Sequence, residues 1–200
     1  MLNIFKNHID VKSFFKRGVK QIEDPWGVLL ITGYMGSGKT YFSVYAVNNL
    51  LPKLKIYTNI HSLKIPDREI IYFDKLDEII NNFDSDCIFL IDEISKKYTK
   101  DSKQDKEFYS WLQQSRKVQR IVILILQEYL QTPTWIRSIA QTVFTTKKIP
   151  FLNLFCTNKG YAELDPETLD WYVVAQERFI YKRNKYITKL YDTFEPVPVL

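Results

Sequence analysis

The chain has 200 residues, of which 46% are hydrophobic and 15% aromatic, a composition typical of a folded globular protein and not of a disordered one. Its net charge of +5 is modest for a nucleic-acid binder, and no apolar run approaches the roughly 18 residues of a membrane-spanning helix, so no transmembrane segment is expected. The two cysteines, Cys87 and Cys156, lie in apolar runs without metal-ligand spacing, which indicates reduced core thiols in a cytoplasmic protein.

Three segments are predicted, which together form one domain. Residues 1–24 form a basic N-terminal arm, either a free amphipathic segment or a helix or strap that packs on the core. Residues 25–150 form an α/β core, and residues 151–200 form a β-rich extension packed on that core, because aromatic and β-branched residues dominate there.

A strand, a glycine-rich loop and a helix follow one another at the start of the core. The apolar run 28–32 predicts a buried parallel strand, and residues 41–50 predict a helix. Between them, the segment Gly33-Tyr34-Met35-Gly36-Ser37-Gly38-Lys39-Thr40 matches the phosphate-loop pattern G-x-x-x-x-G-K-[ST] at every fixed position.

This loop is expected to bind the phosphates of ATP. Its backbone N–H groups and the following helix N-terminus attract anions. Lys39 would reach the β- and γ-phosphates, and the Thr40 hydroxyl would bind Mg²⁺. The alternative, a glycine-rich turn that binds nothing, does not account for the strand and helix on either side.

The next segment predicts further alternation of strands and helices. Residues 55–60 and 68–73 are expected to be strands, and residues 74–83 a helix with Asp74 as its N-cap.

A second nucleotide-site motif follows in the segment Cys87-Ile88-Phe89-Leu90-Ile91-Asp92-Glu93. Asp92 lies at the end of a buried strand, where it would hold the Mg²⁺ shell, and Glu93 would polarise the attacking water. The alternative is a pair of surface acids that cap the next segment.

The stretch from Ser95 to Lys106 is the most basic of the chain. Its lysines could contact nucleic-acid phosphates or simply be solvated before the helix that runs to about Lys117.

The buried strand 120–126 ends in Gln127. Strand C-termini face the ligand crevice of a parallel sheet, so Gln127 is expected to sense the γ-phosphate. A short helix from Thr134 and a strand over 142–149 follow. Beyond them we predict a β-hairpin of Val173–Lys182 with Tyr186–Phe194.

These motifs resemble the FtsK–HerA superfamily of DNA-pumping ATPases. The likeness rests on the Leu90-Ile91-Asp92-Glu93 ending, on the segment from Arg116 to Gln127 and, more weakly, on the strings Thr58-Asn59 and Tyr191-Asp192-Thr193. The short strings resemble genome-packaging ATPases of membrane-containing icosahedral viruses and, more distantly, Zot-like phage assembly proteins. The fold implied is a RecA-like P-loop NTPase: a mostly parallel sheet flanked by helices, with a C-terminal β-hairpin.

The resemblance implies an ATPase that packages double-stranded DNA, works as a hexameric or pentameric ring and acts in the host cytoplasm or the virion, with capsid-vertex or membrane proteins as possible partners. ATP would bind at subunit boundaries, where a neighbour's arginine stabilises the transition state. Arg116 is the favoured candidate, followed by Arg120 and Arg137. The alternatives are a Zot-like assembly or secretion ATPase that acts on protein or virion export and, with less support, a small-molecule kinase.

Overall fold

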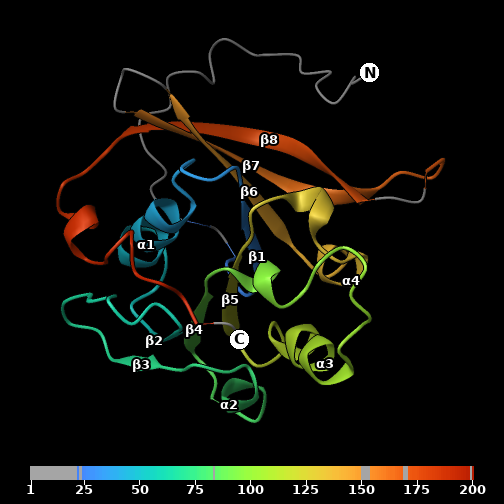
Figure 1. Cartoon of the computed structure of the whole chain (residues 1–200), viewed down its shortest axis with the longest axis horizontal. Coiled ribbons are helices and arrows are strands. Elements are labelled where there is room, and N and C mark those ends of the chain that lie inside the picture. Colours follow the sequence, from blue (N-terminus) through green and yellow to red (C-terminus); the bar gives the residue numbers. More distant parts are fainter. Residues whose placement is uncertain (1–21, 23, 83, 150–153, 169–170, 199) are drawn as a thin grey trace.

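The computed structural model describes residues 22, 24–82, 84–149, 154–168, 171–198 and 200. Within them, an eight-stranded sheet has the order β3-β2-β4-β5-β1-β6-β7-β8 (Figure 1). Strands β1 to β6 are parallel, whereas β7 and β8 extend the sheet as antiparallel strands. The strands are β1 (Gly27–Thr32), β2 (Lys55–Thr58), β3 (Ile70–Tyr72), β4 (Cys87–Ile91), β5 (Arg120–Ile125), β6 (Thr142–Ile149), β7 (Leu154–Leu164) and β8 (Trp171–Lys182). The predicted α/β class with a mostly parallel sheet is confirmed.

Helices cover both faces of the parallel strands. Helix α1 (Lys39–Asn49) lies on one face, and α2 (Asp77–Ile80), α3 (Lys106–Gln114) and α4 (Thr134–Arg137) lie on the other (Figure 1). No helix of the described part of the chain is both long and apolar enough to cross a membrane.

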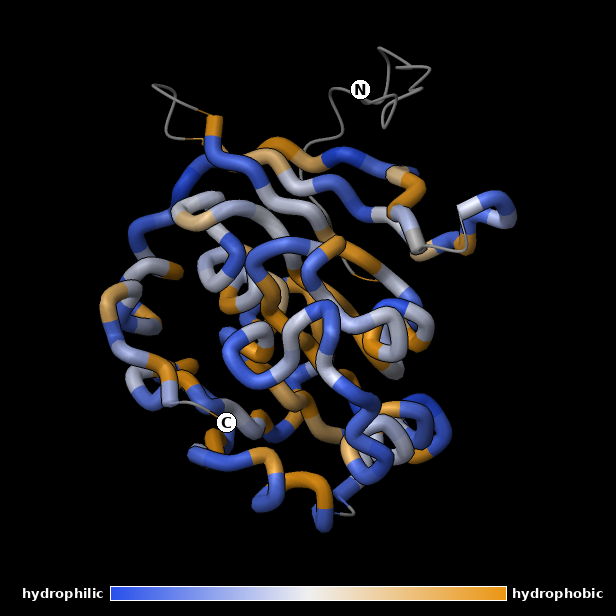
Figure 2. The backbone as a smooth tube through the Cα atoms, turned by 45° about the vertical axis from the view of Figure 1, so that its right-hand side comes forward, coloured by the Kyte–Doolittle hydropathy of each residue, from blue (hydrophilic) through white to orange (hydrophobic). Residues whose placement is uncertain are grey.

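The core consists of two clusters separated by the sheet. Side chains alternate between the faces of a strand, so Leu29 and Ile31 pack with α1 while Val28 and Leu30 pack with the opposite cluster. Because both faces are covered, the central strands are apolar except at their ends, as parallel strands usually are. Figure 2 shows these hydrophobic segments gathered inside the molecule, with polar segments around them.

The strand order brings distant parts of the chain to one edge of the sheet. β5 lies between β1 and β4, with Ile31 of β1 opposite Ile125 and Ile91 of β4 opposite Leu124. The segments that follow these three strands therefore share the C-terminal edge of the sheet, where ligands of open α/β sheets bind.

The C-terminal hairpin differs from the predicted one in its pairing. β8 starts close to the predicted strand and ends at Lys182, but its partner is β7, with Phe155 opposite Tyr181. The prediction of a strand over 186–194 was wrong. The segment instead forms a short 3-10 helix (Ile187–Lys189) and buries Ile187 and Leu190 against α1, whose apolar side chains a second hairpin strand would leave uncovered.

Helix α2 is much shorter than the predicted helix over 74–83, and Asp74 is not its N-cap. The Asp74 carboxylate instead interacts with His61 Nε2 at 3.0 Å. The turn before α2 is closed by the Glu78 carboxylate, which accepts the Lys75 backbone N–H at 3.1 Å. The helix therefore begins only at Asp77.

The predicted basic arm over residues 1–24 lies outside the described residues except for Ile22 and Asp24. The division into arm, core and extension stays a prediction.

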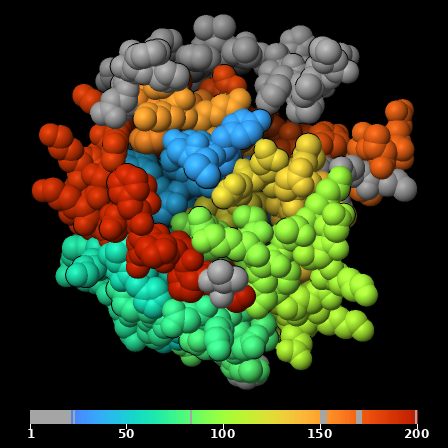
Figure 3. Space-filling model, in the orientation of Figure 1, coloured from blue at the N-terminus to red at the C-terminus, as the bar shows by residue number. Residues whose placement is uncertain are grey.

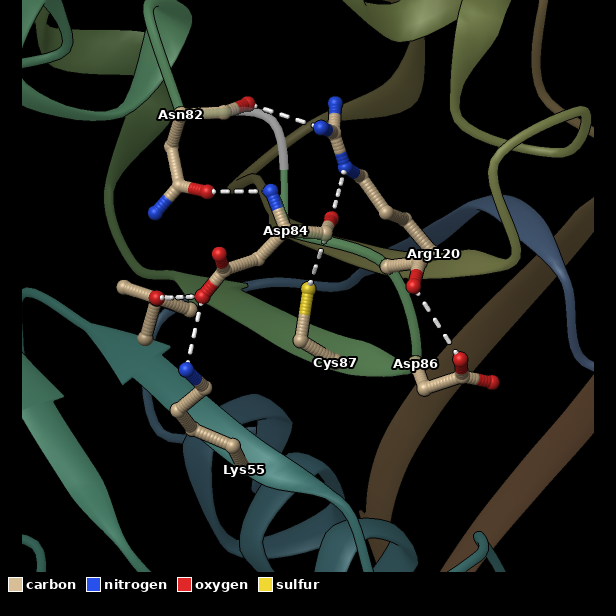
Figure 4. Close-up of polar contacts among 8 residues, drawn as sticks. Lys55, Asn82, Asp84, Asp86, Cys87 and Arg120 are labelled. Atoms are coloured by element: carbon tan, nitrogen blue, oxygen red, sulfur yellow. Dashed lines mark hydrogen bonds and ion pairs between the residues drawn. The ribbon is translucent and has the colours of Figure 1, made fainter.

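A polar cluster joins the N-terminal ends of β2, β4 and β5, at the edge opposite the motifs (Figure 4). The Arg120 guanidinium donates to the carbonyl oxygens of Asp84 at 2.6 Å and Asn82 at 2.7 Å. The Asp84 carboxylate accepts from Lys55 Nζ at 2.6 Å and from the Tyr57 hydroxyl, and both contacts hold the pKa of Asp84 below its usual range. Arg120 thus has a structural role, because it fixes the loop that leads into β4.

Candidate nucleotide site

The phosphate loop needs glycine at positions with left-handed backbone. Gly36 has φ +72° and Gly38 has φ +93°, backbone conformations that residues with a Cβ rarely adopt. A Cβ on Gly38 would lie 2.5 Å from the Phe155 ring of β7, whereas one on Gly36 would meet nothing within 4 Å. Gly38 is therefore needed for packing, and Gly36 opens the loop toward the cavity beside it.

Side chains of the neighbouring strand hold the loop in place. Ser37, which is buried, shares a 2.9 Å hydrogen bond with the Thr146 hydroxyl of β6. Thr146 also lies within 3.3 Å of the Thr32 carbonyl oxygen, which ends β1. The Gly33 N–H donates to the Gln127 carbonyl oxygen at 3.1 Å, so the loop is tied to the segment after β5 as well.

Lys39 points back over the loop from the first turn of α1. Its Nζ donates to the carbonyl oxygens of Gly33 at 2.9 Å and Tyr34 at 3.2 Å. Burial lowers the pKa of the Lys39 ammonium, and the nearby Asp92 and Glu93 carboxylates partly offset this by favouring its charged form. The site thus holds a partly desolvated cation close to two carboxylates.

The first turn of α1 meets the end of β4. Thr40 Oγ1 donates to Asp92 Oδ2 at 3.0 Å, and Asp92 Oδ1 accepts the Glu93 backbone N–H at 2.8 Å. Burial raises the pKa of Asp92 to about 6, although both hydrogen bonds favour the charged carboxylate. A hydroxyl and a carboxylate at this separation are hard oxygen ligands of the kind that Mg²⁺ prefers.

Glu93 follows with an unusual backbone. Its φ of 54° and ψ of 34° are left-handed, a conformation that costs energy for a residue with a side chain. The turn directs the Glu93 carboxylate toward the cavity beside the phosphate loop. There, Oε2 is buried and forms an ion pair with Lys96.

A residue to which the sequence assigned no role holds Asp92 in position. Asn59, fully buried at the end of β2, donates through Nδ2 to the Asp92 carbonyl oxygen at 2.9 Å and accepts the Asp92 N–H at 2.8 Å. Its one signal in the sequence was the string Thr58-Asn59, which contributes weakly to the family resemblance.

One cavity of about 230 Å³ brings the predicted residues together. Gln127, an exposed residue at the end of β5, lies on its wall with the motif residues. The chain's last segment also reaches it, which the sequence did not predict. The lining residues named by the motifs are Met35, Gly36, Lys39, Thr40, Asp92, Glu93 and Gln127, and those of the last segment are Asp192, Thr193, Glu195 and Val197.

The three candidate arginines do not line this cavity. Arg120 is 3% exposed and Arg137 is fully buried beside Thr134 and the Tyr129 ring, so neither guanidinium is available to another molecule. Arg116 precedes β5 at the opposite edge of the sheet, where its exposed guanidinium pairs with Asp24 at 2.6 Å. Of the three, Arg116 alone is positioned to reach another molecule.

The basic stretch lies next to the site, between β4 and α3. Lys100 and Lys103 are exposed, whereas the Lys97 ammonium lies 5.8 Å from the centre of the Tyr98 ring. The Trp135 indole N–H donates to the Ser102 carbonyl oxygen at 3.4 Å and anchors the loop to α4.

Solved structures share this fold. The N-terminal domain of zonular occludens toxin from Neisseria meningitidis is similar with a TM-score of 0.60 and 19% identity, over 83% of this chain and 98% of that one. FlaH, a flagellar accessory protein of Methanocaldococcus jannaschii, gives 0.52 and 13%, over 90% and 93%. The genome-packaging NTPase B204 of Sulfolobus turreted icosahedral virus 2, in complex with ATP-gammaS, gives 0.51 and 10%, over 76% and 98%.

Because the sequence identities are low, the likeness to these structures concerns the fold. It confirms the RecA-like P-loop architecture and the suspected resemblance to Zot-like proteins and genome-packaging ATPases. A search of the curated proteins found no match. The model of the family "Zonular occludens toxin (Zot)" matches residues 27–159, which include the phosphate loop, the Asp92–Glu93 ending and Gln127. That span covers well over half of the chain, and the chain therefore belongs to the Zot family of P-loop proteins.

Proposed function

We propose that this chain is an ATPase that uses Mg²⁺. The observation that carries the proposal is the 3.0 Å hydrogen bond between Thr40 Oγ1 and Asp92 Oδ2, which joins the phosphate loop to the end of β4. Lys39 and Glu93 lie on the wall of the same cavity.

The residues present fit Mg-ATP. The Thr40 hydroxyl and the Asp92 carboxylate would hold the metal, which neutralises charge on the phosphates when it is bound. The backbone N–H groups around Gly36 would face the phosphates, and Lys39 would exchange its two loop carbonyls for phosphate oxygens.

Two further side chains would act on the attacking water. Glu93 would accept its proton as general base, since its carboxylate is the next along the chain after Asp92. Gln127 would lie beside the γ-phosphate, because β5 separates the strand of the phosphate loop from the strand of Asp92.

We further propose that the chain works as a ring with sites at subunit boundaries. Two side chains of the phosphate loop support this: Tyr34 is 71% and Met35 is 85% exposed, large apolar surfaces that a neighbouring subunit would cover. The neighbour's Arg116 would complete the site, since in its own subunit it lies at the far edge of the sheet.

The work that hydrolysis drives has two candidates. Membership of the Zot family favours assembly or export of a phage particle, the role that the resemblance to Zot-like assembly proteins implies. The exposed Lys100 and Lys103 beside the site favour translocation of double-stranded DNA, as in packaging of a viral genome. We place assembly or export first, because the family match covers most of the chain.

The test is the rate of phosphate release from ATP against protein concentration, with and without double-stranded DNA. Lys39→Ala is the inactive control. Specific activity that rises with concentration supports the ring, and stimulation by DNA supports translocation. A rate equal to that of Lys39→Ala under all conditions would contradict the ATPase, and phosphate transfer only to an added small molecule would indicate a kinase.

The basic loop is tested separately with Lys97→Gln, Lys100→Gln and Lys103→Gln combined. Lys96 is kept because it contacts Glu93. If the loop binds DNA, the slope of log affinity against log salt should fall by roughly one per lost phosphate contact. An unchanged slope would assign the loop to solvent.

A further inference from the structure

The carboxylate proposed as general base is already bound by a lysine of its own turn. Lys96 lies three residues after Glu93, in the short 3-10 helix Ile94–Lys96, and its ammonium contacts Glu93 Oε2. The same ammonium donates to the Val197 carbonyl oxygen at 3.3 Å. Lys96 therefore connects Glu93 to the last segment of the chain.

That segment, residues 190–197, is here called the C-terminal strap. It is fixed beside the end of β2 by Ser62: the Ser62 N–H donates to Glu195 Oε2 at 2.9 Å, and the Asp192 N–H donates to Ser62 Oγ at 2.8 Å. In the space-filling view the C-terminal segment crosses the surface beside the segment that follows β4 (Figure 3). Four strap residues line the cavity, so the strap lies next to the reacting groups.

We propose that Lys96 is a positioning residue that restrains Glu93, and that the C-terminal strap keeps Lys96 in the restraining position. This inference rests on the proposed ATPase function. A carboxylate oxygen that contacts an ammonium is held in one orientation, so it is not free to turn toward a water molecule in the cavity. Glu93 can turn toward the attacking water only when the ion pair with Lys96 is broken. Movement of the C-terminal strap favours the breaking of this pair.

The strap is thereby a point at which hydrolysis can be controlled. Any contact that lifts residues 190–197 from Ser62 removes the Val197 carbonyl from Lys96 and leaves the Glu93–Lys96 pair more exposed to water. An exposed pair is weak, so Glu93 is freed more often. Hydrolysis would then be low in the isolated protein and higher when a neighbouring molecule displaces the strap.

The test compares single-site variants of the full chain in steady-state ATP hydrolysis. Lys96→Met keeps the length of the side chain but removes the charge, and it should raise kcat about twofold to fivefold with KM for ATP unchanged. This corresponds to ~0.4–1 kcal/mol, the range of partly exposed ion pairs. Lys96→Arg keeps the charge and should behave like the wild type. Lys53→Met is the matched control, because it removes the charge of an exposed lysine just beyond α1, away from Glu93 and the basic stretch.

The strap is tested by Glu195→Ala, which removes the acceptor of the Ser62 N–H. It should raise kcat in the same direction, and the effect should disappear in a Lys96→Met background, because both changes release the same pair. Fully additive effects would contradict the coupling between strap and Lys96.

Failure of this inference is distinguishable from failure of the ATPase proposal. If the wild type hydrolyses ATP, Glu93→Gln does not, and Lys96→Met has a kcat at or below that of the wild type, Lys96 does not restrain Glu93. If Glu93→Gln hydrolyses ATP like the wild type, the assignment of Glu93 itself is wrong. Circular dichroism and the unfolding midpoint of each variant separate loss of activity from loss of the fold.

Discussion

The Asn59 side chain makes two hydrogen bonds to the backbone of Asp92, at 2.9 Å to its carbonyl oxygen and 2.8 Å from its N–H. These two hydrogen bonds join the end of β2 to the end of β4, directly before Glu93, whose backbone is left-handed. Asn59 is therefore expected to determine where both acids point.

Asn59→Ala should lower the free energy of unfolding by about 1–3 kcal/mol, because it leaves two buried backbone groups without partners. It should also reduce kcat more than KM, since the acids lose their position while the phosphate loop stays intact. Asn59→Asp should be worse, because the carboxylate cannot donate to the Asp92 carbonyl oxygen. Denaturant unfolding and steady-state hydrolysis measure both effects. Wild-type stability in both variants would show that the two bonds contribute nothing.

Lys39→Ala should abolish hydrolysis and strongly weaken binding of ATP, because the phosphates lose the ammonium that faces them. Lys53→Ala, a change at an exposed lysine just beyond α1, is the matched control and should leave both unchanged. Fluorescent-nucleotide titration and phosphate release provide the measurements. Normal turnover by purified Lys39→Ala protein is incompatible with the proposed site.

The two acids should respond differently to substitution. Glu93→Gln should still bind Mg-ATP but turn it over at least about a hundredfold more slowly, as expected when a general base is lost. Asp92→Ala should instead weaken the dependence of nucleotide binding on Mg²⁺, since it removes a proposed metal ligand. Binding titrations at several Mg²⁺ concentrations, together with single-turnover hydrolysis, separate the roles. Equal behaviour of the two variants would refute the division.

Asp92 should also make stability depend on pH in the absence of divalent cations. Burial raises its folded-state pKa to about 6 from an ordinary value of 3.8. The folded protein thus holds the proton more tightly than the unfolded chain, so its stability should fall as pH rises through this window and level off above it. Asp92→Asn cannot titrate and should lack this component. Urea unfolding from about pH 4 to pH 8 measures the difference, and identical slopes for the two proteins would contradict it.

Arg116→Ala should retain affinity for ATP but lose most turnover, because the phosphate loop of the same subunit is intact. Asp24→Asn is the control, because it breaks the ion pair with Asp24 but keeps the Arg116 guanidinium, and it should retain turnover. The decisive measurement mixes Arg116→Ala with Lys39→Ala subunits. A boundary between the intact phosphate loop of the first and the intact Arg116 of the second has a complete site, so partial activity should return. No recovery in verified mixed assemblies would mean that Arg116 does not act across the boundary.

The sequence by itself determined the local chemistry of the site. The phosphate loop from Gly33 to Thr40 and the Asp92–Glu93 ending were readable because their spacing and their flanking apolar strands are local features of the chain. The α/β class followed from the alternation of apolar strands and helices, since that pattern depends on neighbours in sequence.

Only the tertiary structure decided which distant residues meet. The sheet order places Asn59 and Glu93 at one edge, and the C-terminal strap packs beside them. No local pattern specifies strand order, because it is set by how the helices and strands pack. The predicted pairing of β8 with residues 186–194 was wrong for the same reason. That segment has strand-like composition, but in the fold it covers the apolar side chains of α1. Packing likewise removed Arg120 and Arg137 from the candidates, because a sequence shows that an arginine is present but not whether its guanidinium is buried.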